Sequence, residues 1–129
     1  MSRLLLDTHT FLWWIDDAPE LTVTARRAIA DVNHECYLSV ASCWEMAIKS
    51  SLCKLRLARP VERFVSEQLT ANGFTLLNIE LHHTAKVEKL PFHHRDPFDR
   101  LLIAQAMTEK LTIVTADSVF TDYGVKVLW

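Results

Sequence analysis

The sequence predicts an α/β fold in which helices cover both faces of a central parallel sheet, forming an α/β/α sandwich. Short, nearly continuous apolar runs alternate with longer amphipathic segments along the chain. Such runs are typical of strands that are buried on both faces of a parallel sheet. The right-handed crossovers that join parallel strands then place helices on both sides. With 129 residues, the chain is expected to form a single domain, 1–129.

Five apolar runs supply the expected strands. The first ends at Asp7 after three consecutive leucines, and the fourth is followed by Asp117. An acid directly after a buried strand stands at the carboxyl edge of the sheet, although capping of the next helix is a competing explanation for Asp7. In chain order, the strands are expected over 3–6, 36–40, 74–77, 111–115 and 125–128, the last at the sheet edge.

The helices are identified by a 3.6-residue apolar period and by the residues at their ends. Thr22 or Thr24 is expected to cap the second helix, and Ser39 the third. Asp96 followed by Pro97 is typical of an N-cap with proline at the first helical position. The helices are expected over 11–15, 21–32, 40–52, 60–71 and 81–89, and the last begins at Pro97.

Charge and composition narrow the class of protein. The formal net charge is -2, so nucleic acid would have to bind to a local basic patch. Glycine occurs only at Gly73 and Gly124, which nearly excludes a P-loop or a dinucleotide-binding fingerprint. The basic residues concentrated in the first half, which a solvated surface would also explain, are Lys49, Lys54, Arg56, Arg59 and Arg63.

The cysteines are odd in number and lack Cys-x-x-Cys spacing, so they suggest neither a disulfide framework nor a zinc site. We expect Cys36, Cys43 and Cys53 to be buried free thiols in a reducing compartment. No apolar run approaches membrane-spanning length. A cytoplasmic location without membrane association is therefore expected.

Two further acids fall on helices. Asp99 lies in the first turn of the last helix, on the face that carries apolar residues such as Ile103, where a carboxylate is costly. Its interaction with the helix dipole and first-turn amides is the alternative explanation. Glu45 borders the predicted apolar stripe of its helix, but an i,i+4 pair with Lys49 or a capping box with Ser42 remains open. The stripe is predicted to consist of Ala41, Trp44, Ile48 and Leu52.

The carboxyl edge of a parallel sheet is where these acids are expected to converge. Asp7 and Asp117 follow strand ends, while Glu45 and Asp99 lie early on helices. At ~4 Å and an effective dielectric of about 20, each ionised pair costs roughly 4 kcal/mol. Shared protons or bound cations relieve that repulsion, and oxygen ligands favour Mg²⁺ or Mn²⁺. Phosphodiester hydrolysis suits such a site.

Two histidine pairs, His82-His83 and His93-His94, invite a metal-site interpretation. Adjacent residues are not expected to point to a common centre, and neither pair has a cysteine or an i+4 histidine to complete a zinc set. We therefore interpret these histidines as surface or substrate-contacting imidazoles.

Four blocks carry the acids in chain order. They are Leu4-Leu-Leu-Asp7-Thr-His, Ser39-Val-Ala-Ser-Cys-Trp-Glu45-Met-Ala-Ile-Lys49, Arg95-Asp-Pro-Phe-Asp99-Arg-Leu-Leu-Ile-Ala and Val114-Thr-Ala-Asp117-Ser-Val-Phe120. In order and spacing, these blocks resemble those of PIN-domain ribonucleases, most closely the VapC-type toxins of bacterial type II toxin-antitoxin systems. The resemblance covers essentially the whole chain.

The resemblance implies a Rossmann-like PIN domain with the activity of an Mg²⁺- or Mn²⁺-dependent endoribonuclease that acts as a toxin. Its acidic quartet corresponds to Asp7, Glu45, Asp99 and Asp117, with Asp96 as an accessory acid. The implied partners are an RNA substrate, a cognate antitoxin that occludes the site, and a second copy in a homodimer. Many members have asparagine where this chain has His9, so the role of His9 stays open. Phe11, Trp13 and Trp14 suit either a dimer face or the core. A catalytically silent PIN-like module that binds RNA or protein is the alternative function.

Overall fold

The computed structural model describes residues 2–129 and confirms the predicted α/β fold with an all-parallel sheet. The strands are β1 (Arg3–Leu6), β2 (Glu35–Ser39), β3 (Thr75–Leu77), β4 (Thr112–Val114) and β5 (Val127–Leu128). They lie in the order β3-β2-β1-β4-β5, with β5 at the predicted edge. Because β1 and β4 are neighbours, segments from opposite ends of the chain meet at the centre of the sheet.

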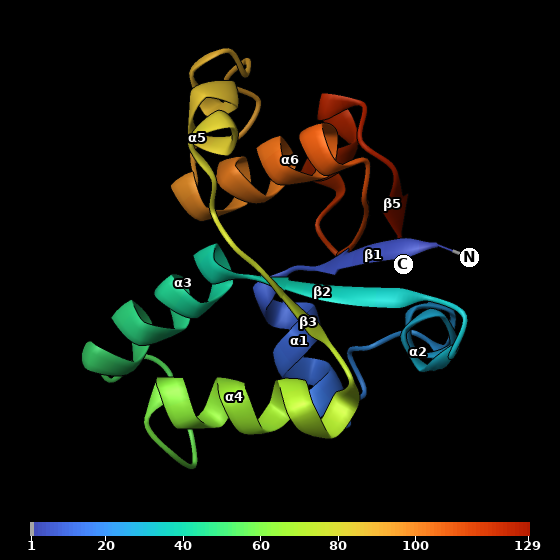
Figure 1. Ribbon diagram of the computed structural model, residues 1–129, viewed down its shortest axis with the longest axis vertical. Coiled ribbons are helices and arrows are strands. Elements are labelled where there is room, and N and C mark those ends of the chain that lie inside the picture. The colour runs from blue at the N-terminus through green and yellow to red at the C-terminus, as the bar shows by residue number, and fades with distance from the viewer. Residues whose placement is uncertain (1) are drawn as a thin grey trace.

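Helices cover both sides of this sheet (Figure 1). The helices are α1 (Thr8–Ile15), α2 (Val23–Ala30), α3 (Val40–Ser51), α4 (Val61–Asn72), α5 (Leu81–Glu88), α6 (Pro97–Glu109) and a 3-10 helix, η1 (Ser118–Tyr123). Figure 1 shows α5 and α6 on one side and α1 and α4 on the other. The predicted three-layer arrangement is confirmed, whereas η1 was not predicted.

Local side-chain caps explain where several helices begin. Thr22 accepts from the Ala25 amide and Ser39 from the Ala41 amide, which confirms both predicted caps. Asp7 caps α1, so this helix begins at Thr8 rather than at the predicted Phe11.

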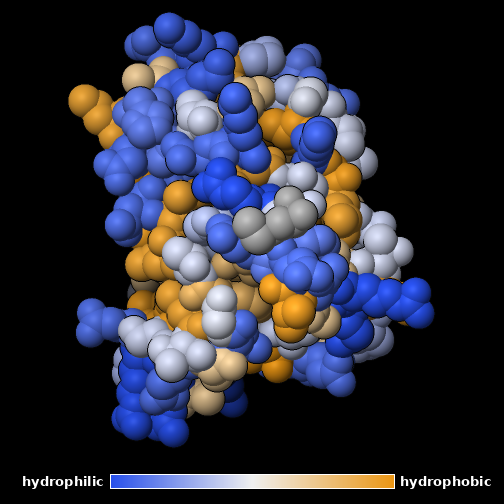
Figure 2. Space-filling model, turned by 45° about the vertical axis from the view of Figure 1, so that its right-hand side comes forward, coloured by the Kyte–Doolittle hydropathy of each residue, from blue (hydrophilic) through white to orange (hydrophobic). Residues whose placement is uncertain are grey.

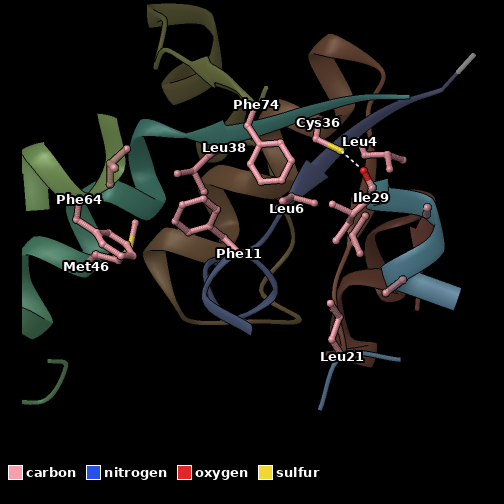
Figure 3. Packing of buried hydrophobic residues seen from close by; sticks show 14 residues of the cluster. Leu4, Leu6, Phe11, Leu21, Ile29, Cys36, Leu38, Met46, Phe64 and Phe74 are labelled. Atoms are coloured by element: carbon pink, nitrogen blue, oxygen red, sulfur yellow. Dashed lines mark hydrogen bonds between the residues drawn. The ribbon is translucent and has the colours of Figure 1, made fainter. Parts of the chain in front are cut away.

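Each face of the sheet has its own hydrophobic core. Leu4 and Leu6 point into the core beneath α1, α2 and α4, while Leu5 points into the core beneath α6. Figure 3 shows Phe11 packed beside Leu38 and Phe74 in the first core. Phe11 is fully buried there, which settles its position in the core rather than on an exposed face.

Helix α3 differs from the sequence prediction in the face that it buries. The predicted stripe residues Trp44 and Leu52 are 55% and 58% exposed. Trp44 instead lies edge-on to Phe98, with ring centroids 5.0 Å apart. The prediction assumed that apolar side chains select the inner face, but the helix turns a partly polar face toward the protein. The buried residues of α3 are Ala41, Ser42, Glu45 and Met46.

The three cysteines are free, but only Cys36 is buried. Cys43 is half-buried and Cys53 is exposed at a positive φ of 57°, so the prediction of three buried thiols is wrong. Cys53 is exposed because it lies in the turn after α3. Burial raises the pKa of Cys36 and of Cys43 to about 11, which favours the protonated thiol at neutral pH.

The surface mixes polar and apolar residues. Figure 2 shows one face on which hydrophilic residues gather toward the top and bottom, with hydrophobic residues between them. Among residues 2–129, no helix has both the length and the apolarity required to cross a membrane.

Candidate active site

An acidic pocket of about 140 Å³ lies at the carboxyl edge of the sheet. Strands β1 and β4 end there side by side, and the Asp7 amide donates to the Val114 carbonyl at 3.3 Å. Helices α3 and α6 begin at the same edge, which explains how residues far apart in sequence converge. The residues that line it are Asp7, Thr8, His9, Glu45, Lys49, Asp96, Asp99 and Asp117. The structure thus brings all five predicted acids together, while their chemical roles stay predictions.

Asp7 is held rigidly between the ends of β1 and β4. One carboxylate oxygen, Oδ1, accepts from the Thr10 amide at 2.8 Å, and Oδ2 accepts from the Thr115 hydroxyl at 2.5 Å. Its side chain caps α1, as the competing explanation proposed, and it also faces the pocket. Capping and a place in the site are therefore not exclusive, because the two oxygens leave further lone pairs for a ligand.

Glu45 is a buried carboxylate, only 6% exposed. The Thr8 hydroxyl donates to its Oε1 at 2.7 Å, and the Lys49 ammonium donates to its Oε2 at 2.5 Å. The i,i+4 pair with Lys49 exists, but it lines the pocket rather than an open surface. The capping-box explanation is wrong, because α3 begins at Val40 and Ser39 is its cap.

Asp96 and Asp99 occupy the start of α6. As predicted, Asp96 caps this helix by accepting from the Asp99 amide at 3.0 Å. The Asp99 Oδ2 atom pairs with the His94 Nε2 atom at 2.7 Å. Burial raises the pKa of Asp99 to about 6; the neighbouring Asp96 and Asp7 act in the same direction, and His94 opposes them. The electrostatic potential at Asp99 is therefore negative, and its carboxyl group is partly shielded from water.

Asp117 closes the pocket from the strand β4 side. It caps η1 by accepting from the Val119 amide at 3.0 Å, and its side chain is 47% exposed. Its Oδ2 atom lies 3.9 Å from the His94 Nε2 atom. His94, Asp99 and Asp117 each offer one ligand atom, and these three atoms lie within 4.8 Å of one another.

The histidine prediction is only partly right. His82 is exposed, but His83 is 1% exposed, which contradicts a surface position. Both rings reach Oε2 of Glu109, at 3.1 Å and 3.0 Å, so the expectation that neighbours would not share a centre is also wrong. The cause is tertiary, because the end of α6 brings Glu109 against α5.

Sequence reasoning missed the hydroxyl groups that orient the acids. Thr8 serves Glu45, and Thr115 serves Asp7 while it also accepts from the Asp117 amide at 3.1 Å. Both threonines are buried. The available signal was local, since Thr8 follows the first acid directly and Thr115 precedes the last acid by two residues.

The pocket has a donor set that suits a hard divalent cation. Five carboxylates line it. Among the described residues, only Lys49 and His94 form ion pairs with any of these carboxylates. The excess of negative charge in a partly buried site favours binding of cations. Oxygen atoms predominate among the possible ligands, which is the preference of Mg²⁺ and Mn²⁺ rather than of a thiolate-seeking metal.

Comparison with known proteins supports both the fold and the family. A family model described as PIN domain matches residues 4–126. The protein named Ribonuclease VapC22, from Mycobacterium tuberculosis, is 30% identical over 118 residues, which cover 91% of this chain and 88% of that protein.

Solved structures with a similar fold come from complexes. VapBC2 from Rickettsia felis, bound to a DNA fragment from their promoter, gives a TM-score of 0.71 at 15% identity, covering 97% of this chain and 96% of that chain. DNA-bound VapBC from Salmonella typhimurium gives a TM-score of 0.68 at 17% identity, covering 98% and 97%. FitAcB from Neisseria gonorrhoeae gives a TM-score of 0.66 at 20% identity, covering 96% of this chain and 95% of that chain. At these identities the structures support the fold alone. The match of the PIN-domain model over residues 4–126, together with the 30% identical relative, shows that the chain belongs to the PIN-domain family.

Proposed function

We propose that this protein is an Mg²⁺- or Mn²⁺-dependent endoribonuclease and the toxin of a type II toxin-antitoxin system. The observation that carries the proposal is the convergence of five carboxylates on one pocket at the carboxyl edge of the sheet. The similarity of the chain to a relative named as a ribonuclease points to the same chemistry. The catalytic and metal-binding residues in this proposal are Asp7, Glu45, Asp96, Asp99 and Asp117.

The cation would be held by the carboxylates of Asp7, Glu45, Asp99 and Asp117, with Asp96 as an accessory acid. When bound, it supplies Lewis-acid chemistry that activates water and neutralises charge on the scissile phosphate. The chain's own residues prepare the site for it. Thr8, Lys49 and Thr115 fix the orientation of their carboxylate partners, as outer-shell groups do in metal sites generally.

His94 pairs with Asp99, a carboxyl that lines the pocket. Because the pKa of Asp99 is raised to about 6, this carboxyl is deprotonated above that pH and available as a ligand. His94 holds the Oδ2 atom through its Nε2 atom, which favours the charged form of the carboxyl.

The same proposal includes partners and location. Solved structures of similar fold include DNA-bound VapBC proteins and a toxin-antitoxin complex from Klebsiella pneumoniae. An antitoxin that places a basic side chain in the acidic pocket fits the excess of negative charge there. An RNA substrate, a homodimeric state and a cytoplasmic location without membrane association complete the proposal.

The test is cleavage of total cellular RNA by purified protein, free of antitoxin, in Mg²⁺, in Mn²⁺ and in EDTA. Asp99→Asn is the matched control for contaminating nucleases, since an amide has nearly the same volume and can still accept from His94. Discrete fragments that require both the metal and Asp99 are expected. Folded wild-type protein that cuts no RNA in either metal would contradict the proposal and favour a catalytically silent binding module.

A further inference from the structure

A second and larger pocket, of about 450 Å³, adjoins the acidic pocket. It lies between α1, the segment that joins α3 to α4, and α4 itself. His9 lines both pockets, so its side chain lies at the boundary between them. A volume of this size is in the range of pockets that hold small organic groups.

The boundary between the pockets is aromatic. The exposed ring of His9 stacks on Trp13 one helical turn later, with centroids 5.5 Å apart and planes inclined by 21°. Trp13 also packs against Trp129, with ring centroids 5.8 Å apart. A packed indole thus supports an imidazole that still has access to solvent. Stacking platforms of this kind bind unpaired nucleobases, because every base has a π-face.

The charges around the larger pocket also suit a nucleotide. Arg56 lines it and forms no ion pair with any residue between Ser2 and Trp129, so its guanidinium is available to a phosphate or a base edge. Glu67 is neutralised by Arg59 at 3.1 Å and by Arg63 at 2.8 Å, which limits repulsion of a phosphate. Asp16 can accept hydrogen bonds from an exocyclic amino group.

We propose that this pocket, defined by His9, Trp13 and Arg56, binds an unstacked base of the RNA next to the scissile phosphate. The inference rests on the proposed function and gives His9 a role in it, as the stacking surface between the acidic pocket and the base site. Recognition of RNA through splayed single-stranded bases requires a platform beside the reactive centre. An adjoining pocket with a preformed ring stack supplies one.

The experiment measures binding of fluorescein-labelled single-stranded oligoribonucleotides in an Asp99→Asn background, so that nothing is cleaved. His9→Ala is expected to weaken binding about 5- to 150-fold, the range for replacing an aromatic platform with alanine. His9→Phe, which keeps a flat ring without a titratable nitrogen, is expected to retain most of the affinity. His82→Ala, at an exposed histidine that lines neither pocket, is the matched control.

A second probe separates bases from backbone. The second probe is an oligoribonucleotide whose bases are removed, leaving abasic riboses. On this probe, His9→Ala is expected to bind as tightly as the protein that retains His9. An equal loss on complete and abasic probes, or no loss on either, would overturn the inference and leave the pocket to a protein partner. Because the assay needs no turnover, that result is distinct from failure of metal-dependent cleavage by the wild type, which tests the proposed function.

Discussion

At two places in residues 2–129, three possible metal-ligand atoms lie within 4.8 Å of one another. One set consists of Asp99 and Asp117, which line the acidic pocket, and His94, which pairs with them. The other set is His82, His83 and Glu109, which we call the histidine cluster. The acidic pocket adds three further carboxylates, from Asp7, Glu45 and Asp96. The histidine cluster has a single carboxylate, which both of its imidazoles face.

Hydrogen bonds occupy both ring nitrogens of His83 in the histidine cluster. The Glu80 amide donates to Nδ1 of His83 at 2.9 Å, so the neutral ring carries its proton on Nε2. That Nε2–H group donates to Glu109 at 3.0 Å and has no lone pair for a cation. Donation from His83 and His82 lowers the pKa of Glu109, whereas burial raises that of Asp99. The two sets of ligand atoms meet the same distance limit, but their carboxyl pKa values shift in opposite directions. Negative charge that lacks a positive partner therefore distinguishes the acidic pocket as the candidate cation site.

The largest expected difference between the two clusters is in RNA cleavage. Asp117→Asn should reduce metal-dependent cleavage at least ~100-fold, because loss of a ligand should exceed the 10- to 100-fold cost typical of losing an outer-shell partner. The amide oxygen can still accept from Val119, so folding should be retained. Glu109→Gln should leave cleavage within about threefold of the wild type. Initial rates at saturating Mg²⁺ measure both effects. Similar losses in the two variants would contradict the claim that the clusters differ in their role in cleavage.

In the histidine cluster, the expected effect of a substitution is on folding stability, and it depends on burial. His83→Ala removes a ring that is 1% exposed and leaves the Glu80 amide without its partner, so unfolding free energy should fall by roughly 2–4 kcal/mol. His82→Ala, at a side chain that is 59% exposed, should cost less than about 1 kcal/mol. Urea denaturation monitored by tryptophan fluorescence measures both. Equal costs would show that the buried ring does not support the α5 and α6 contact.

The pH dependence of stability gives the clusters opposite signs. Asp99 has a folded pKa of about 6 against an ordinary 3.8, so its protonated form favours folding, and stability is lost as pH rises through that interval. In EDTA, Asp99→Asn should therefore exceed the wild type in stability at pH 7.5, by at most about 3 kcal/mol, and the gain should vanish near pH 4. Glu109→Gln should instead lose stability at pH 7.5, because its pKa is lowered on folding. Denaturant curves at the two pH values test the signs, and a gain for Asp99→Asn that persists unchanged near pH 4 would contradict them.

The smallest effect concerns the partner of Asp99. His94 lowers the pKa of that carboxyl through its hydrogen bond, so His94→Ala should move the Asp99 titration to higher pH. NMR titration of the Asp99 side-chain carboxyl reports it directly. A titration that moves to lower pH in His94→Ala would mean that the imidazole does not stabilise the carboxylate.

Signals confined to a few residues predicted the elements well. Asp96 followed by Pro97 marked the start of α6, and Ser39 marked that of α3, because a capping side chain acts on amides two or three residues away. The alternation of strands and helices also predicted a parallel sheet with acids at its carboxyl edge. That edge is where Asp7 and Asp117 lie.

Interactions between distant segments were beyond such signals. The hydroxyl that holds Asp7 comes from Thr115, 108 residues away, and the partner of His83 is Glu109, 26 residues away. The buried face of α3 was misjudged for the same reason, since the hydroxyl that holds Glu45 comes from Thr8, 37 residues away. Local hydrophobicity favoured Trp44, which the fold leaves exposed.

The most direct test is a Mn²⁺ titration of the wild type, Asp99→Asn and Glu109→Gln, followed by electron paramagnetic resonance of the unbound ion. We expect saturable binding to the wild type, a loss of at least tenfold in affinity in Asp99→Asn, and no change in Glu109→Gln. Both amides are nearly isosteric with the acids that they replace, so each variant is a matched control for the other. Binding that survives Asp99→Asn but disappears in Glu109→Gln would place the cation in the histidine cluster and contradict the account.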